Sequence, residues 1–273
     1  MGIIQGSAYA GAMTGLYAAW YKDYPHSSFH FFNDMKEWKG MDKVGHVYSA
    51  YAESLAGAEL WRFTGIDDKK RVWLGGLNAL AYQMTIEVLD GFSKEWGFSM
   101  GDAVANIVGS GAFISQELLW KEQRLQLKWS FHRKGYDDPT LTERSNYLFG
   151  RSNPERYLKD YNGQAYWLSV NLKNFFPHSL IPDWLQLSVG TGAEGMFGGY
   201  SNVYEPGKGD PYFSRTDIKR HRQWYLAPDI DFTKIRTNKK GLKILFGVMN
   251  ILKFPAPTIE WSNGKLKGHL IYF

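Results

Sequence analysis

The chain has 273 residues and a formal net charge of +5, and 44% of its residues are hydrophobic. This composition is sufficient for a hydrophobic core and argues against a disordered chain. Basic and acidic residues are interspersed and no nucleic-acid-binding module is recognisable, so we expect no nucleic-acid partner. The sequence contains no cysteine, which excludes disulfides, thiolate metal sites and a lipobox acylation site within it.

Aromatic side chains make up 16% of the chain, including 11 tryptophans. Tyrosine and tryptophan are frequent at membrane interfaces and in large sheets, because each ring has an apolar body and a polar edge. The mean hydropathy of -0.38 argues against a polytopic inner-membrane protein. The positive charge is consistent either with an ordinary solvated surface or with attraction to anionic lipid or lipopolysaccharide.

The first half of the chain is predicted to be helical. Helices are expected at residues 7–21, at 42–63, from 67 or 68 to about 89, and from 99 to about 121. Glycines recur along these segments and allow close helix approach. No basic residue precedes the apolar run at residues 3–20. Either a signal peptide has been removed from this numbering or the run is a first helix, and we favour both.

The pattern changes after Glu122, where apolar and polar residues begin to alternate. This alternation predicts a half-buried strand at residues 125–131. Further strands are expected at residues 164–172, 185–197 and 223–232, a loop-rich stretch at 133–160, and a short amphipathic helix at 244–252. One strand places an apolar set on one face and a small or polar set on the other: Leu187, Val189, Thr191 and Ala193 against Ser188, Gly190, Gly192 and Glu194.

The end of the chain predicts a hairpin. Residues 258–261 and 265–273 flank Asn263-Gly264, which is the preferred pair for a type I′ turn. A last strand that ends on Tyr272 and Phe273 resembles the insertion signal of bacterial outer-membrane barrels. The alternative is an ordinary final strand that buries its last ring.

These elements predict an α+β protein. Residues 1–123 would form an N-terminal four-helix part, and residues 124–273 would form an antiparallel β part. We count six or seven strands. They would either form a small outer-membrane barrel or pack against the helices, and eight strands is the smallest usual closed barrel.

Three polar pairs, each spaced about one helical turn, interrupt the apolar helices. Residues three or four apart share one helix face, and an unpaired buried polar group costs about 1–3 kcal/mol. We therefore expect the pairs to converge, with Lys43 and the capping residue Ser99 beside them. The predicted polar cluster is Asp42, Lys43, His46, Glu87, Asp90, Ser99, Asp102 and Asn106.

Three interpretations of this cluster stay open. It is either a buried hydrogen-bond and salt-bridge network that fixes helix register, a divalent metal site, or a catalytic site with His46 as general base and Lys43 neutralising phosphate. The metal ligands would be Asp42, His46, Glu87, Asp90 and Asp102. Glu53 and Glu59 are expected to face solvent or Arg62.

The order of these motifs carries a family resemblance. The runs 41–46, 85–91 and 96–102, followed by Asn106 and Gly109, resemble the YfiM-like family of bacterial envelope proteins, described as predicted lipoproteins. The same order of motifs is similar to VanZ-like membrane proteins. The full length, with residues 159–164 and 267–269, resembles the longer Bacteroidota form of the YfiM-like family. The resemblance implies an envelope location and no established activity, and the chain departs from it because it has no cysteine to acylate.

Two functions are compatible with these observations. The first is a non-catalytic accessory or structural subunit of an outer-membrane protein assembly, located in the outer membrane or facing the periplasm. Its partners would be outer-membrane proteins and the lipid bilayer or lipopolysaccharide. This hypothesis rests on a large β part and on the absence of Gly-x-Ser-x-Gly, phosphate-loop and His-Glu-x-x-His motifs. The second is a metal-assisted hydrolase or transferase acting on lipid-linked or glycan phosphate through the helix cluster.

Overall fold

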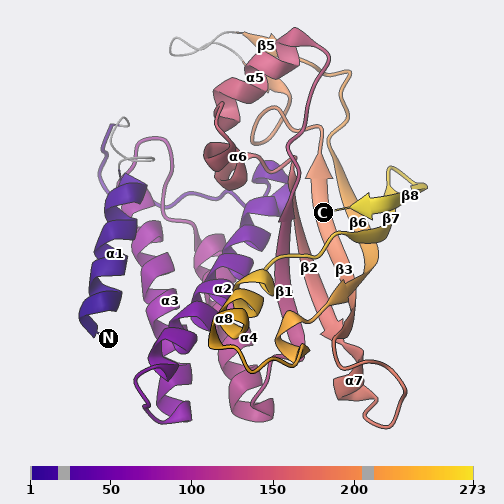
Figure 1. Ribbon diagram of the computed structural model, residues 1–273. Helices are drawn as coiled ribbons and strands as arrows, with labels where there is room; N and C mark the ends of the chain where they lie inside the picture. The colour runs from indigo at the N-terminus through magenta and orange to yellow at the C-terminus, as the bar shows by residue number, and fades with distance from the viewer. Residues whose placement is uncertain (1, 18–24, 205–211, 273) are drawn as a thin grey trace. The chain divides into compact units, whose positions relative to one another are not determined.

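The computed structural model describes residues 2–17, 25–204 and 212–272. The chain divides into two compact units: a helical unit, of residues up to 35 and 43–123, and a sheet unit, of residues 36–42 and 124–273. The mixed α+β class, with helices followed by an antiparallel sheet, is confirmed (Figure 1). Helices also occur after residue 123, so the helical content is not confined to the N-terminal part.

The helical unit is built on small-residue contacts. Its elements are α1 (Gly2–Leu16), α2 (Met41–Arg62), α3 (Asp68–Asp90) and α4 (Met100–Trp120), α2 starting two residues inside the sheet unit. A Cβ on Gly75 would lie 2.6 Å from the backbone nitrogen of Ala58, so α2 and α3 touch through backbone. Gly109 of α4 lies against the Val47 carbonyl of α2 in the same way. Larger residues at these two positions would separate the helices.

The helix boundaries follow the capping chemistry. Asp67 accepts a hydrogen bond from the Lys70 N–H at the start of α3, and Ser99 accepts one from the Asp102 N–H at the start of α4. α1 begins before the residue 7 that the sequence predicted, and positions 18–21 of that predicted helix lie outside the described residues.

The sheet unit contains a six-stranded antiparallel sheet with the order β1-β2-β3-β6-β7-β8. Its strands are β1 (Leu125–Phe131), β2 (Gln164–Asn171), β3 (Leu185–Glu194), β6 (His221–Ile230), β7 (Ala256–Ser262) and β8 (Lys265–Tyr272). Of the two arrangements that the sequence left open, the small barrel is wrong, because β1 and β8 do not pair within the described residues. Residues 251–253 occupy the outer edge of β1 instead: Trp129 N–H donates to the Ile251 carbonyl over 3.1 Å, and Lys253 N–H donates to the Trp129 carbonyl over 2.9 Å.

The polarity of the sheet is inverted relative to an ordinary soluble sheet. Leu187 and Val189 of β3 are 41% and 50% exposed, whereas Ser188 between them is fully buried. Trp224 of β6 and Trp261 of β7 pair in register and are also exposed. The predicted alternation therefore holds along most of the sheet, with apolar residues outside and mainly small or polar residues inside, among which the rings of Trp167 and Tyr225 are buried. At the end of β3 it does not hold: Ala193 is fully buried.

The stretch predicted as loop-rich contains two helices, α5 (Pro139–Phe149) and α6 (Asn153–Lys159). Their starts carry signals that the prediction passed over. Asp138 precedes Pro139 and caps α5, and Ser152 forms a capping box with Glu155 at the start of α6. Short elements complete the unit: η2 (Glu37–Gly40), α7 (Leu172–Phe175), β4 (Val203–Tyr204), β5 (Phe213–Ser214) and η3 (Phe232–Lys234).

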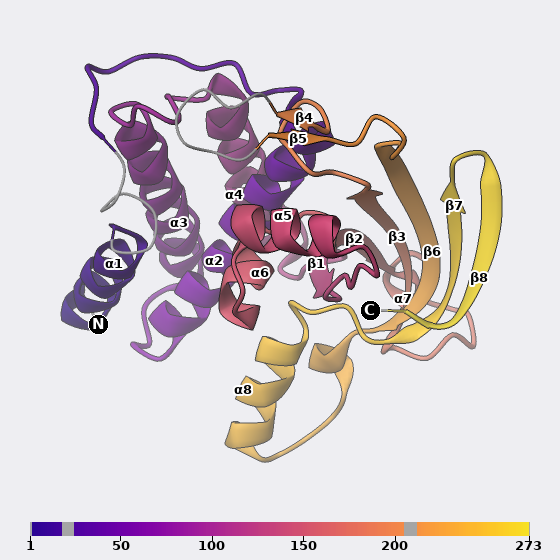
Figure 2. The same cartoon turned by 90° about the horizontal axis from the view of Figure 1, so that it is seen from above.

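Two C-terminal predictions can be compared with the structure. The hairpin is confirmed, with Asn263 and Gly264 both at positive φ between β7 and β8. Tyr272 is buried and its hydroxyl donates to the Tyr225 hydroxyl over 2.6 Å. Phe273 lies outside the described residues, so the insertion signal stays a prediction. Figure 2 shows the chain leaving β6, forming α8 (Lys240–Met249) away from the strands, and returning to β7.

Candidate functional site

Lys43 is the central cation of the polar cluster in the helical unit. Its Nζ lies 2.8 Å from Asp34 Oδ1 and 2.9 Å from Asp102 Oδ1. Ser99 ties these groups together, since its hydroxyl donates to Asp34 over 2.7 Å and accepts from the Asp102 N–H. The residue that caps α4 therefore also positions the two carboxylates around Lys43.

His46 lies one turn further along α2, between α3 and α4. Its Nδ1 is 3.1 Å from Asn106 Oδ1 and 3.6 Å from Glu87 Oε1, and its Nε2 is 3.7 Å from Asp102 Oδ1. Glu87 and Asn106 are essentially fully buried. The imidazole therefore faces the helix partners that the sequence assigned to it.

Two of the predicted residues have other observed contacts. Asp42 stands one turn before His46 on α2, and its Oδ1 accepts a hydrogen bond of 2.6 Å from Tyr161, which belongs to the same unit as Asp42. Asp90 is half-buried at the end of α3, one turn after Glu87, and its backbone carbonyl accepts from the Ser93 N–H. The structure thus brings together, within the helical unit, Lys43, His46, Glu87, Ser99, Asp102 and Asn106.

A pocket of about 800 Å³ opens beside this cluster. Lys43 and Asp34 are its charged wall. The rest of the wall is mainly apolar and comes from residues 31–35, α2, Phe98 and α4: Phe31, Phe32, Met35, Val44, Val47, Phe98, Met100, Val104 and Ala105, with Asn33 and Gly101. Such a pocket fits a ligand that is mostly apolar and polar at one end.

Part of the apolar wall comes from a short segment that pairs with Phe98, two residues before α4. Phe32 N–H donates to the Phe98 carbonyl and Phe98 N–H donates to the His30 carbonyl, over 3.0 and 2.9 Å. The rings of Phe31 and Phe98 then meet edge to face at 5.4 Å. Backbone pairing of two distant segments thus places Asp34 beside Ser99, which no local sequence signal predicted. Asp34 and the phenylalanines are the site residues that the sequence reasoning missed.

The site contains more carboxylates than basic groups. The carboxylates of Asp34, Asp102 and Glu87 face one lysine and one imidazole. The buried Nδ2 of Asn106 has no hydrogen-bond partner among the described residues. A negative, hydrogen-bonding pocket end favours a cationic group of a ligand or a divalent ion.

Glu53, a second carboxyl group on α2, is less exposed than the sequence predicted. Glu53 is half-buried and accepts a 2.8 Å hydrogen bond from Gln83, whereas Glu59 pairs with Arg62 at 2.7 Å as expected. Burial raises the pKa of Glu53 from 4.5 to about 7, and the Gln83 hydrogen bond and His46 only partly oppose this. The expectation failed because Glu53 lies on the α2 face that packs against α3.

The ligand atoms of the polar cluster show how well it could hold a metal ion. The His46 imidazole and the Asp102 carboxylate each offer one ligand atom, and these two atoms lie within 4.8 Å of each other. Imidazole and carboxylate together suit a first-row divalent ion. Lys43 competes for the same Asp102 oxygen, so a metal would have to displace or share that ion pair.

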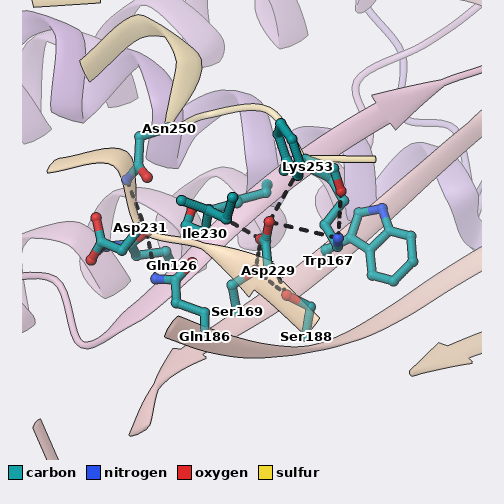
Figure 3. Close-up of polar contacts among 12 residues, drawn as sticks. Gln126, Trp167, Ser169, Gln186, Ser188, Asp229, Ile230, Asp231, Asn250 and Lys253 are labelled. Atoms are coloured by element: carbon teal, nitrogen blue, oxygen red, sulfur yellow. Dashed lines mark hydrogen bonds and ion pairs between the residues drawn. The ribbon is translucent and has the colours of Figure 1, made fainter. Parts of the chain in front are cut away.

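The sheet unit contains a second polar network, which the sequence reasoning missed (Figure 3). Asp229 Oδ2 lies 3.0 Å from Lys128 Nζ and accepts hydrogen bonds from Ser169 and Ser188. Lys253 Nζ lies 3.6 Å from Asp229 Oδ1 and 5.1 Å from the centroid of the Trp167 ring. Burial lowers the pKa of both lysines, and Asp229 only partly opposes it.

This network continues to a second carboxylate. Gln126 donates to Asp231 over 2.9 Å and accepts from both Gln186 and Asn250. The signal that could have found it is the inverted alternation itself, because serines and glutamines on the inner face must bond to something. The side chains of Lys128 and Asp229 are fully buried, and neither residue lines the pocket beside Lys43. The network therefore serves as a polar core for the sheet.

Comparison with known proteins gives one match. Residues 30–116 match the model of a family described as predicted periplasmic lipoprotein (DUF2279). No curated protein and no solved structure matches the chain. None of the helices that the structure describes is long and apolar enough to cross a membrane.

The matched segment coincides with the site. All residues that line the large pocket lie within residues 30–116, and so do Lys43, His46, Glu87 and Asp102. The match supports an envelope protein that faces the periplasm. The match does not show the narrower resemblance to YfiM-like or VanZ-like proteins, and that resemblance stays a prediction.

Proposed function

We propose that the protein is a non-catalytic, periplasm-facing envelope protein that binds an amphiphilic molecule in the pocket of the helical unit. One observation carries this proposal: an apolar pocket of about 800 Å³ ends on the Lys43–Asp34 ion pair. The apolar chain of the ligand would lie against Phe31, Phe98 and Val104. A polar head would meet one cation and one carboxylate, which suits a zwitterionic group.

The pocket can be blocked without touching the charged wall. Val104 lines the pocket and is 55% exposed, so Val104→Trp fills the space at little cost to folding. We expect the full chain to bind an acyl-labelled fluorescent lysophosphatidylcholine, whose head is zwitterionic, and the variant to bind it at least about tenfold more weakly, because the lost apolar contact is worth about 0.8 kcal/mol per CH₂. Fluorescence titration measures this affinity.

The matched control lies one turn along the same helix. Val108 is 52% exposed and does not line the pocket, so Val108→Trp adds the same ring to α4 outside the site. It should bind the probe as the unchanged chain does. Equal loss in both variants, or no saturable binding by the unchanged chain, would contradict the proposal.

A second candidate is a metal-assisted hydrolase or transferase acting on lipid-linked or glycan phosphate. It is favoured by the proximity of the His46 and Asp102 ligand atoms beside the same pocket. Calorimetric titration with Mn²⁺ and Zn²⁺ tests it. Stoichiometric binding that His46→Ala abolishes would support this candidate, and no heat at millimolar metal would remove it.

The accessory-subunit role is a broader proposal, compatible with amphiphile binding. It is supported by the exposed apolar face of the sheet, on which Leu187, Val189 and Trp261 lie. Outer-membrane proteins would be the partners and the outer membrane the location. Native co-purification from detergent-solubilised envelopes tests both, and recovery of the chain alone would argue against a stable assembly.

A further inference from the structure

The segment that links β6 to β7 has a one-sided charge. No acidic residue occurs between Asp231 and Glu260, and five basic residues fall within positions 234–243. They are Lys234, Arg236, Lys239, Lys240 and Lys243. Of these, Arg236 and the last three are exposed. This stretch is a compact cationic surface on a chain whose charges are otherwise interspersed.

The helix that follows is apolar on its exposed side. In α8, Ile244 is 54% exposed, Leu245 47% and Val248 57%. No residue of α8 is fully buried. Phe246 turns back to the unit, stacking on Phe232 at 6.2 Å between centroids. The helix therefore packs on the unit through this ring and presents Ile244, Leu245 and Val248 to the outside.

The basic residues stand beside the apolar ones on this helix. Lys240 and Lys243 are three residues apart and share one face, and Ile244, four residues after Lys240, begins the adjoining apolar stripe that Val248 and Leu245 continue. A basic stripe beside an apolar stripe is the pattern of helices that lie in a membrane interface, with the lysine stems reaching up to the headgroups.

A pocket at the base of this segment adds a basic recess. It has a volume of about 550 Å³ and is lined by Trp184, Lys234 and Arg236, together with Pro182, Asp183, Ile230 and Ile235. Tryptophan beside basic side chains suits the headgroup level of a bilayer. The cationic stretch and the helix are consecutive in the chain, the recess shares Lys234 and Arg236 with that stretch, and all three belong to one unit.

We propose that residues 234–248 bind the surface of a bilayer that contains anionic lipids. The apolar side of α8 enters the interface, and the lysines before and within it contact lipid phosphates. The charge complementarity selects an anionic bilayer over a purely zwitterionic one. This contact is independent of the pocket in the helical unit, and it would bring the sheet unit to a membrane face without a spanning helix.

Vesicle co-sedimentation of the full chain tests the proposal. We expect binding to vesicles of equal parts phosphatidylglycerol and phosphatidylcholine, and much weaker binding to phosphatidylcholine alone. Each lysine near an anionic surface contributes about fivefold in affinity, so Lys239→Gln, Lys240→Gln and Lys243→Gln together should weaken binding about 100-fold. High salt should release the unchanged chain.

Matched variants distinguish the contribution of this surface to vesicle binding from the contribution of the net charge of the chain. Lys219→Gln, Lys265→Gln and Lys267→Gln remove the same charge from exposed positions elsewhere in the sheet unit and should leave binding within about twofold. Ile244→Ser with Val248→Ser should weaken binding about tenfold or more, whereas Leu158→Ser with Leu180→Ser, at least as exposed elsewhere in the sheet unit, should not. Equal binding to both vesicle types, or equal loss in the two lysine triples, would overturn the proposal.

Discussion

Both units contain a buried lysine held by carboxylates, and they differ in what lies beside it. The Lys43 side chain is 12% exposed and forms part of a pocket wall. The Lys128 side chain is fully buried, and so is its partner Asp229. The first ion pair can be reached by a ligand, whereas the second is enclosed by serines and a backbone carbonyl. Access therefore distinguishes a candidate site from a polar core.

The difference also follows from how each unit fills its interior. The helices approach through glycines and leave space at the start of α4, where Phe31 and Phe98 build a wall. The sheet has its apolar residues outside, so its inner face must satisfy polar groups within a small volume. The buried charges of the sheet unit thus belong to a polar inner face, whereas the buried charges of the helical unit lie on otherwise apolar helices.

The largest expected effect concerns the closed network. Asp229→Asn leaves Lys128 and Lys253 buried without a counter-charge in direct contact, which should cost about 3–5 kcal/mol. Asp102→Asn should cost about 1–2 kcal/mol, because Lys43 keeps Asp34 and reaches the pocket. Hydrogen exchange, measured separately on peptides of β6 and α4, gives the two stabilities in one chain. Equal costs in the two units would break the comparison.

The second expected effect is that the free energy of unfolding of the helical unit depends on pH through Glu53. The pKa of Glu53 is raised from 4.5 to about 7 by burial, so the folded unit holds a proton that the unfolded chain releases. The resulting stability is complete below pH 4.5, falls as the pH rises toward 7, and is lost above it. The loss is about 3 kcal/mol at 1.36 kcal/mol per pKa unit.

Glu53→Gln should keep the Gln83 contact and remove this dependence, making the variant more stable than the unchanged chain at pH 8. Urea unfolding at pH 5 and pH 8 measures the difference, with α3 and α4 followed by hydrogen exchange. Glu59→Gln on the same helix is the control, since its pair with Arg62 is more than half exposed. A slope that survives Glu53→Gln would assign the titration to another group.

The sequence predicted the elements wherever periodicity and capping agree. Ser99 before α4 and Asn263-Gly264 between β7 and β8 are local signals, and both were interpreted correctly. The open sheet was not predicted, because the edge of β1 is covered by residues 251–253, which lie more than a hundred positions away. Long-range edge pairing leaves no local pattern.

The same limit applies to the candidate site. Helical spacing sufficed to place His46 opposite Glu87 and Asp102, because each pair shares a helix face. Asp34 and the aromatic wall depend on the pairing of residues 30–32 with residue 98, and no spacing rule reaches that far. The charged half of the site could be anticipated from the sequence, whereas the pocket that gives it a ligand class could not.

The smallest expected effect on stability comes from replacing one helix-capping serine in each unit. Ser99→Ala removes the α4 cap and the hydrogen bond to Asp34, and should cost about 1–2 kcal/mol. Ser152→Ala removes the exposed capping box of α6 and should cost about 1 kcal/mol. Only the first should also weaken binding of the lysophosphatidylcholine probe, by about threefold, because Asp34 then loses the donor that fixes it on the pocket wall. Fluorescence titration of both variants under folding conditions measures this. An equal response of the probe to both variants would mean that the Ser99–Asp34 contact contributes to the stability of α4 and not to the site.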